Sequence, residues 1–223
     1  MNWETEGYLL SKRKFRENAN IINVFTKLKG KISGIVYGGN SRKIRNYLQI
    51  GNKIFLTYSS KNENSIGYFK TELIDPISPK YFDNKEITTA ILSTSNLLKQ
   101  LLPESQSNQR IYNNLENLIS RYVEKDWIIH FISWELKLIK ELGYGFELDT
   151  SNKTQSEVQL IKVDGINYSI PKFLLKKTEI TKITKKEIRA GLNLTRNIYM
   201  NKFFIPNNLI FPSTRIMLEK YYS

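Results

Sequence analysis

The stretch "ANIINVFTKLKGKISGIVYGG" (Ala19–Gly39) holds two runs rich in β-branched and aromatic residues, with Gly30 between them. Such runs favour β-strands, and glycine is typical of the turn that joins two of them. Three further runs of this kind are "EGYLLSKRKF" (Glu6–Phe15), "NKIFLTYSS" (Asn52–Ser60) and "IGYFKTELI" (Ile66–Ile74). The first 75 residues therefore predict five short antiparallel strands.

Five strands in so short a segment favour a small closed barrel such as the OB-fold, and an open five-stranded sheet is the alternative. From Lys85 onward the apolar period becomes helical, and Pro103 ends the first helix. Further helices are predicted at Ile111–Tyr122, Asp126–Leu142, Lys185–Phe204 and Pro212–Tyr222. A β-hairpin is predicted near 157–170, with Asp164-Gly165 as its turn.

The expected fold is therefore α+β, with a barrel followed by a mainly helical domain. The boundary falls in "DPISPKYFDN" (Asp75–Asn84), where two prolines interrupt both patterns. We expect an OB-fold domain at 1–78 and a helical domain at 79–223.

Composition narrows the class of protein. The chain has 223 residues, 40% of them hydrophobic, and no cysteine, so it has no disulfide and no cysteine-based zinc site. No apolar run approaches the roughly 18 residues of a membrane span, and the N-terminus lacks the apolar core of a signal peptide. A cytoplasmic location is expected.

The net charge of +13 is unevenly distributed. Residues 1–80 carry 14 Lys/Arg against 6 Asp/Glu, residues 81–150 carry 7 against 10, and residues 151–223 carry 13 against 5. A compositional bias toward lysine would not spare the middle of the chain. The asymmetry favours a polyanion, and nucleic acid in particular, as the partner of both ends.

A search for catalytic chemistry yields little. The single histidine, His130, sits in the apolar run "WIIHFISW" and is interpreted as a core residue. The acids Glu124, Asp126, Glu135 and Glu141 are interpreted as a solvated helix face. "GGNSRK" lacks the Gly-Lys-Ser/Thr ending of a P-loop and does not obviously open a helix. We expect no catalytic residue, no cofactor and no metal site, and hence no enzyme.

The cations of the first third indicate binding chemistry instead. They lie at strand ends and in loops, from which they could converge on one side of the barrel and contact phosphates. An ordinary soluble barrel rim is the alternative. Tyr37 and Tyr47 flank the basic loop and are candidates for base stacking. The predicted DNA-binding residues are Lys12, Arg13, Lys14, Arg16, Lys27, Lys29, Lys31, Arg42, Lys43 and Arg45.

Three blocks of the sequence resemble RecO, the bacterial recombination mediator family. The first is "GYLLSKRKFRENANIINVFTKLKGKISGIVYGGNSRK"; within it the shared pattern comprises Glu17, Phe25, Thr26, Gly30, Gly38, Gly39, Arg42 and Lys43. The second is "WELKLIKELGYGFELD", and the third is "LNLTRNIYMNKFF" followed by "STRIML". They occur in the family's order along nearly the whole chain.

The resemblance implies an N-terminal OB-fold and a helical C-terminal domain. It also implies binding of single- and double-stranded DNA, annealing without ATP, and help to RecR in loading RecA onto SSB-coated DNA. In the family's RecFOR pathway of DNA damage repair, RecF is an indirect partner, so the protein is expected at the nucleoid. Some members carry a four-cysteine zinc site after the Gly-Tyr-Gly turn, and this chain has no cysteine there.

In the family the acidic tail of SSB docks on the helical domain. A carboxylate-terminated peptide needs an apolar pocket with cations at its rim, and Arg196, Lys202 and Arg215 are the candidates here. Two other classes of function remain open at this point: an OB-fold protein that binds RNA, and a scaffold that binds only proteins.

Overall fold

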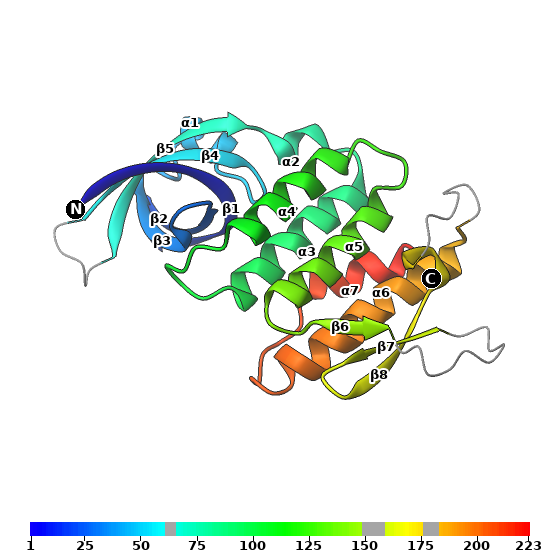
Figure 1. The fold of residues 1–223 in the computed structure, drawn as a ribbon. Helices are drawn as coiled ribbons and strands as arrows, with labels where there is room; N and C mark the ends of the chain where they lie inside the picture. The colour runs from blue at the N-terminus through cyan, green and yellow to red at the C-terminus, as the bar shows by residue number, and fades with distance from the viewer. Residues whose placement is uncertain (61–65, 149–158, 176–182) are drawn as a thin grey trace. The chain divides into compact units, whose positions relative to one another are not determined.

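The computed structural model describes residues 1–60, 66–148, 159–175 and 183–223. Its N-terminal part is a closed barrel in the strand order β1-β2-β3-β5-β4 (Figure 1). The strands are β1 (Asn2–Arg16), β2 (Ala19–Thr26), β3 (Gly30–Tyr37), β4 (Lys53–Ser59) and β5 (Gly67–Asp75). The prediction of a closed barrel is confirmed, and the alternative of an open five-stranded sheet is excluded. The topology is that of an OB-fold.

The long strand β1 makes closure possible. Its first half pairs with β4, from Asn2↔Ser59 to Tyr8↔Lys53, and its second half pairs with β2. The pairing with β2 begins at Gly7, and a register shift lies between Leu9 and Ser11. An extra residue at such a bulge bends a strand and increases its twist, so one strand serves two sides of the barrel.

The barrel is closed by a short parallel pairing of β3 with β5, in which Gly34 lies opposite Gly67. The strands enclose an apolar core, because alternate residues point inward. The buried core consists of Leu9, Ile22, Val24, Ile32, Val36, Leu48, Ile54, Leu56 and Phe69.

The long helices agree with the apolar periodicity, whereas two short helices were not predicted. The short ones are α1 (Arg42–Tyr47) and α2 (Ile77–Lys80). The long ones are α3 (Lys85–Leu101), α4 (Gln109–Arg121), α5 (Trp127–Glu141), α6 (Lys185–Tyr199) and α7 (Ser213–Lys220). A π-helical turn, Met200–Phe204, continues α6, and a 3₁₀ turn spans Lys172–Leu174.

The predicted hairpin is present as β7 (Gln159–Val163) and β8 (Ile166–Ile170). Asp164 and Gly165 both have positive φ, 45° and 81°, as the turn of a tight hairpin requires. A third strand, β6 (Phe146–Leu148), pairs with β7, so the sheet has one strand more than predicted. The start of the expected hairpin, residues 157–158, lies outside the described residues.

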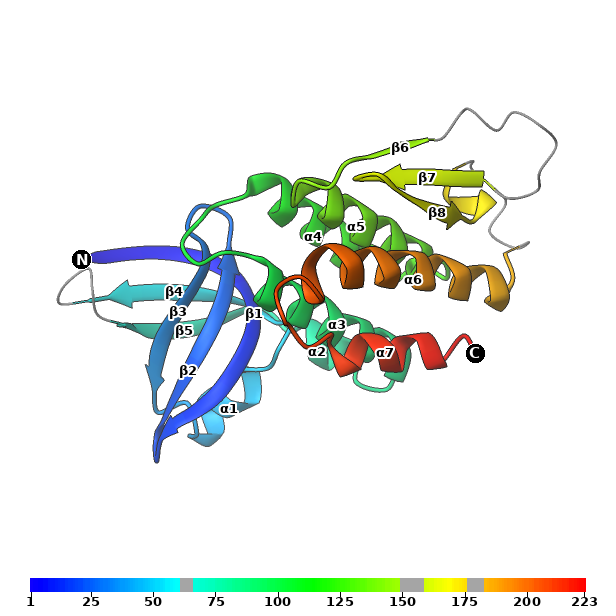
Figure 2. The ribbon, with the colours of Figure 1, turned by 90° about the horizontal axis from the view of Figure 1, so that it is seen from below.

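The chain forms two compact units, Met1–Tyr112 with Pro212–Arg215, and Asn113–Phe211 with Ile216–Ser223. In the second unit α5 is the buried centre, as predicted, and α6 runs beside it (Figure 2). Glu135 of α5 is not on a solvated face, because its side chain is fully buried. The Thr195 hydroxyl donates a hydrogen bond of 2.7 Å to its carboxylate. Within the described residues, no helix is long and apolar enough to cross a membrane.

Candidate nucleic-acid interface

The basic loop after Gly39 opens a helix, contrary to the sequence interpretation. Ser41 is the extended N-cap residue, and helix α1 carries Arg42, Lys43 and Arg45. In the turn before it Gly38 has a φ of 67°, and the Asn40 side chain accepts a hydrogen bond from the Asn20 side chain and donates one to the Glu17 carbonyl. Because the apolar Ile44 packs against the barrel core, α1 presents its cations on a short, anchored element.

The end of β1 lies beside α1. The Lys12 ammonium donates a hydrogen bond of 2.8 Å to the carbonyl of Leu48, the residue that ends α1. Partial burial, and after it the charge of Arg45, lowers the pKa of Lys12. Two of the three predicted cation clusters therefore meet here. Because like charges held this closely repel one another, a bound anion would stabilise them.

An exposed pair of tyrosines stands next to these cations. The rings of Tyr37 and Tyr68 are stacked, with centroids 5.2 Å apart and 23° between their planes. A hydrogen bond to Tyr68 is the main cause that raises the pKa of the Tyr37 hydroxyl, and the nearby charge of Arg16 opposes it. Both rings are exposed, by 53% and 41%, and leave a flat apolar surface open to solvent.

More aromatic rings continue the row along the barrel. Tyr58 lies 5.4 Å from Phe69, and Trp3 stacks on Tyr58 at 4.4 Å. The Lys29 ammonium lies 5.7 Å from the centre of the Trp3 ring. We call Tyr37, Tyr68, Phe69, Tyr58 and Trp3 the aromatic row.

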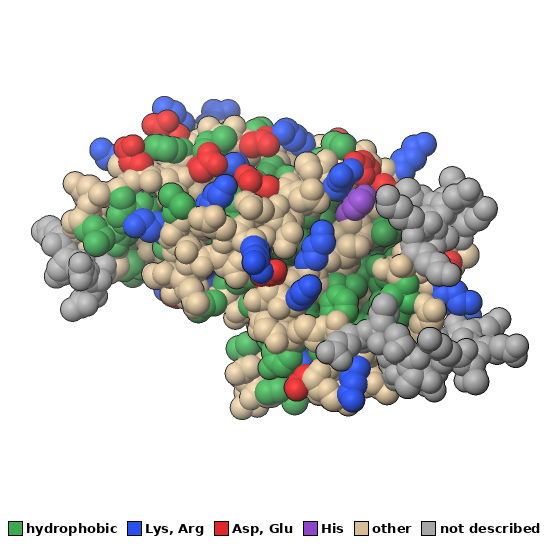
Figure 3. Space-filling model, in the orientation of Figure 1, with side chains coloured by type: hydrophobic (Ala, Val, Ile, Leu, Met, Phe, Trp, Pro, Cys, Tyr) green, Lys and Arg blue, Asp and Glu red, His purple; other side chains and the backbone are tan. Residues whose placement is uncertain are grey.

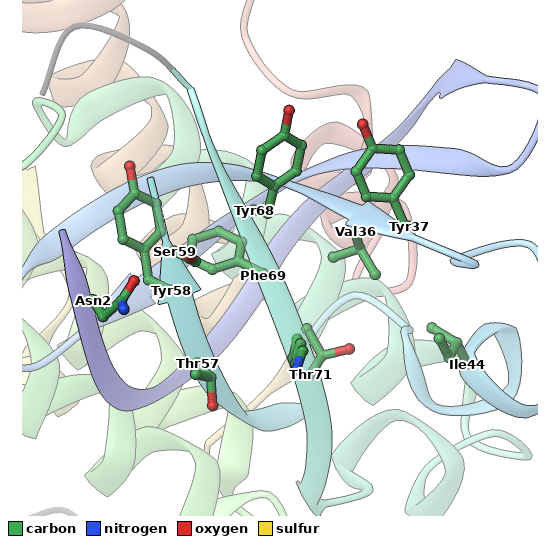
Figure 4. A pocket seen from close by; sticks show the side chains of 11 residues that line it. Asn2, Val36, Tyr37, Ile44, Thr57, Tyr58, Ser59, Tyr68, Phe69 and Thr71 are labelled. Atoms are coloured by element: carbon green, nitrogen blue, oxygen red, sulfur yellow. The ribbon is translucent and has the colours of Figure 1, made fainter. Parts of the chain in front are cut away.

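A groove of about 540 Å³ lies along much of this row. Figure 4 shows Tyr37 and Tyr68 side by side on one wall, with Tyr58 and Phe69 further along and Ile44 of α1 at the other end. Lys70 adds a cation to the lining. The exposed rings of Tyr37 and Tyr68 thus offer flat faces for stacking, whereas Phe69 belongs to the buried barrel core, and cations are available for phosphates.

The predicted cations lie near both ends of strand β3. Lys27 and Lys29 lie in the β2–β3 turn, whereas Tyr37 ends β3, so the length of strand β3 separates Lys29 from Tyr37 by about 25 Å at about 3.3 Å per residue. The aromatic row fills this separation. The cations therefore lie at two basic ends that aromatic rings join.

Two predicted residues have structural roles. Lys31 is nearly buried; its ammonium donates a hydrogen bond of 2.7 Å to the Lys99 carbonyl and lies 3.4 Å from a Glu104 carboxylate oxygen. The Tyr47 hydroxyl donates to the Thr71 carbonyl, and its ring packs against the barrel core. Neither side chain presents its polar end to solvent, so neither is part of the interface proposed below.

The cations expected around an SSB-tail pocket are engaged within the protein. Arg196 forms an ion pair of 2.9 Å with Glu219, and Lys202 forms one of 2.8 Å with Asp164. Arg215 is fully buried and is not a surface residue. Arg215 is therefore not available to an SSB tail at the surface, whereas the Arg196 side chain stays partly exposed beside Glu219.

Sequence reasoning missed Trp3, Tyr58, Tyr68 and Phe69. The pairing of β4 with β5 sets Tyr58 opposite Phe69 and Ser59 opposite Tyr68. The sequence did contain a usable signal. The segments "TYSS" and "GYFK" lie at the adjoining ends of two consecutive predicted strands, so a hairpin would bring their aromatic residues together. Only the closed barrel brings them to Tyr37, which belongs to β3.

The chain combines an OB-fold barrel that carries a basic, aromatic groove with a helical unit. It is therefore a two-part protein of the OB-fold class. Residues 1–77 match the family described as Recombination protein O N terminal, and residues 86–207 match Recombination protein O C terminal. The chain belongs to the RecO family.

Curated relatives agree with this assignment. A protein named DNA repair protein RecO from Roseobacter denitrificans is 33% identical over 164 residues, which are 73% of this chain and 68% of that one. Relatives of the same name from Ehrlichia chaffeensis and a Wolbachia of Culex pipiens are 29% and 27% identical. These two alignments cover 94% and 100% of this chain, and 93% and 100% of the relatives.

Proposed function

We propose that this protein is a DNA repair and recombination mediator that binds single- and double-stranded DNA and anneals complementary strands without ATP. Membership of the RecO family over both parts of the chain supports this proposal. The observation that carries it is the aromatic row with cations at both of its ends.

The mechanism of annealing follows from the chemistry of this groove. Bases of a single strand stack on exposed rings, a contact that tolerates any sequence because every base has a π face. Lysine and arginine at the two ends neutralise phosphates and release counterions. A second strand meets less repulsion on the neutralised first strand, and its paired bases leave the rings for the duplex.

The partners in this proposal are DNA, RecR and the C-terminal tail of SSB, with RecA and RecF as indirect partners. RecO would help RecR to load RecA onto DNA that SSB covers. The proposed setting is the nucleoid in the cytoplasm. The reaction needs no catalytic residue, since annealing is favourable once the repulsion between strands is reduced.

The test is annealing of complementary oligonucleotides, with and without SSB, by the wild type and by a variant with Arg42→Glu, Lys43→Glu and Arg45→Glu. These residues lie on exposed α1 and not in the barrel core. We expect the triple variant to melt near the wild-type temperature and to lose annealing. Its affinity for single strands at moderate salt should fall by at least about tenfold, because three phosphate contacts are lost and repulsion is added.

A matched control reverses Lys137, Lys140 and Lys220, which are exposed on the helical unit and change the net charge equally. If both triple variants lost annealing and affinity equally, the loss would follow from net charge alone. That result would contradict a binding site on the barrel. Competition between single-stranded DNA and RNA of equal length separates this proposal from an RNA-binding protein. A wild type that shifts no nucleic acid at low salt would instead indicate a protein scaffold.

A further inference from the structure

The only histidine of the chain lies at the surface of the second unit, not in its core. The His130 side chain is 33% exposed, and Figure 3 shows it (purple) beside acidic side chains (red). Its Nε2 atom lies 3.1 Å from a Glu124 carboxylate oxygen and 3.4 Å from an Asp126 carboxylate oxygen. The interpretation of His130 as a buried core residue is wrong, because the first turn of α5 turns this side chain toward the α4–α5 connection.

The three side chains match the spacing of a metal coordination sphere. Zinc binds imidazole nitrogen and carboxylate oxygen at about 2.0–2.2 Å. Two such ligands at a tetrahedral angle lie about 3.4 Å apart, and at a right angle about 3.0 Å apart. The distances of 3.1 and 3.4 Å fall in this range, and the three ligand atoms all lie within 4.8 Å of one another.

Two further contacts hold the carboxylates in place. Asp126 is the N-cap residue of α5 but makes no side-chain cap hydrogen bond, so its carboxylate faces His130 and not the helix backbone. Arg121 holds one oxygen of Glu124 at 2.6 Å and leaves the other oxygen toward His130. Outer partners of this kind orient metal ligands.

The charges also suit a divalent cation. With a neutral imidazole, Glu124, Asp126 and Arg121 together carry one net negative charge. One nitrogen and two carboxylate ligands favour a borderline ion such as Zn²⁺, whereas Mg²⁺ prefers a full shell of oxygens and keeps its waters. All three side chains are partly exposed, which leaves room for water in the remaining coordination positions.

We propose that Glu124, Asp126 and His130 form a binding site for a divalent metal ion of the zinc class. The ion ties the α4–α5 connection to the first turn of α5 and stabilises the helical unit. This site is separate from the four-cysteine site of some RecO proteins, for which this chain lacks the ligands. It does not depend on the proposed function.

The test is titration of the tag-free, full-length protein with Zn²⁺, followed by calorimetry and by thermal unfolding. Because the chain has one histidine and no cysteine, every imidazole NMR signal belongs to His130. We expect one Zn²⁺ per chain, a shift of the His130 ring signals on binding, and little response to Mg²⁺. The melting temperature should rise by about 5–11 °C at a hundredfold excess over the dissociation constant.

Variants His130→Gln and Asp126→Asn should each weaken Zn²⁺ binding by at least about tenfold. Glu141→Gln, which removes an acid at the other end of α5, should bind as the wild type does. A folded wild type that binds no Zn²⁺ would show that the cluster is only an ion pair and overturn the proposal. Zn²⁺ binding retained by folded His130→Gln would overturn it as well.

Discussion

Tyr37 and Tyr47 show how much the role of a single residue depends on its surroundings. Both are tyrosines that flank the basic segment, and the sequence does not distinguish them. Tyr37 is half exposed and stacked on Tyr68, whereas Tyr47 donates a hydrogen bond to the Thr71 carbonyl. One ring is available for a base, and the other packs against the barrel core.

Substitution of these two tyrosines should separate binding from stability. Tyr37→Leu should reduce the free energy of single-strand binding by about 1–3 kcal/mol, the range for loss of one stacked base. Tyr47→Phe should leave DNA affinity unchanged and reduce the free energy of unfolding by about 1 kcal/mol, since one hydrogen bond is lost. Fluorescence anisotropy and denaturant melts measure both quantities. The opposite pattern would exclude Tyr37 as a stacking residue.

At the scale of elements, closure of the barrel depends on the pairing of β3 with β5. Gly34 and Gly67 face each other there, and both lie against aromatic rings. A Cβ atom at Gly34 would collide with the ring of Phe69, and one at Gly67 would collide with the ring of Tyr58. The two glycines therefore make room for members of the aromatic row at the place where the barrel closes.

Gly34→Ala should consequently destabilise the barrel, by about 1–3 kcal/mol in the free energy of unfolding, because the added methyl group overpacks the site. The control is Gly145→Ala, where a Cβ meets no atom within 4 Å and should change stability by less than about 0.5 kcal/mol. Chemical denaturation of both variants provides the comparison. Equal stability of the two would show that the Phe69 ring moves aside without cost.

At the scale of the whole molecule, the positive charge is concentrated at particular places and is not spread evenly over the chain. The net charge of +13 belongs to both ends of the chain, and the barrel places part of it at the two ends of the aromatic row. Charge in this position acts on phosphates at close range, whereas dispersed surface charge is largely screened at physiological salt.

Single-strand affinity should therefore depend steeply on salt. If Arg16, Lys29 and the three α1 cations each contact one phosphate, a plot of log K against log salt should have a slope of about −3.5, at −0.7 per contact. The α1 triple variant should have a slope that is shallower by about 2. Anisotropy titrations at several salt concentrations measure this. A wild-type slope near zero would remove electrostatics as the main source of affinity.

The sequence alone determined the barrel strands, the β7–β8 hairpin, the long helices and their order, although it did not predict strand β6. Runs of β-branched residues, the Asp164-Gly165 turn and the 3.6-residue apolar period of α3 to α6 are local signals, and local backbone preference is enough to interpret them. The family could also be inferred from sequence, since its motifs are contiguous blocks. The short helix α1 was missed, because six residues without a buried side chain of their own leave no apolar period.

Only the tertiary structure decided which side chains meet. The aromatic row combines residues from β1, β3, β4 and β5, and Lys31 is buried by contacts from residues about 70 positions away. His130 was expected in the core and is partly exposed, whereas Glu135 was expected at the surface and is buried against Thr195 of α6. Burial along α5 thus depends on what packs against each side chain, and not on its neighbours in the sequence. Contacts between residues far apart in sequence depend on how the strands and helices pack, so no local pattern contains them.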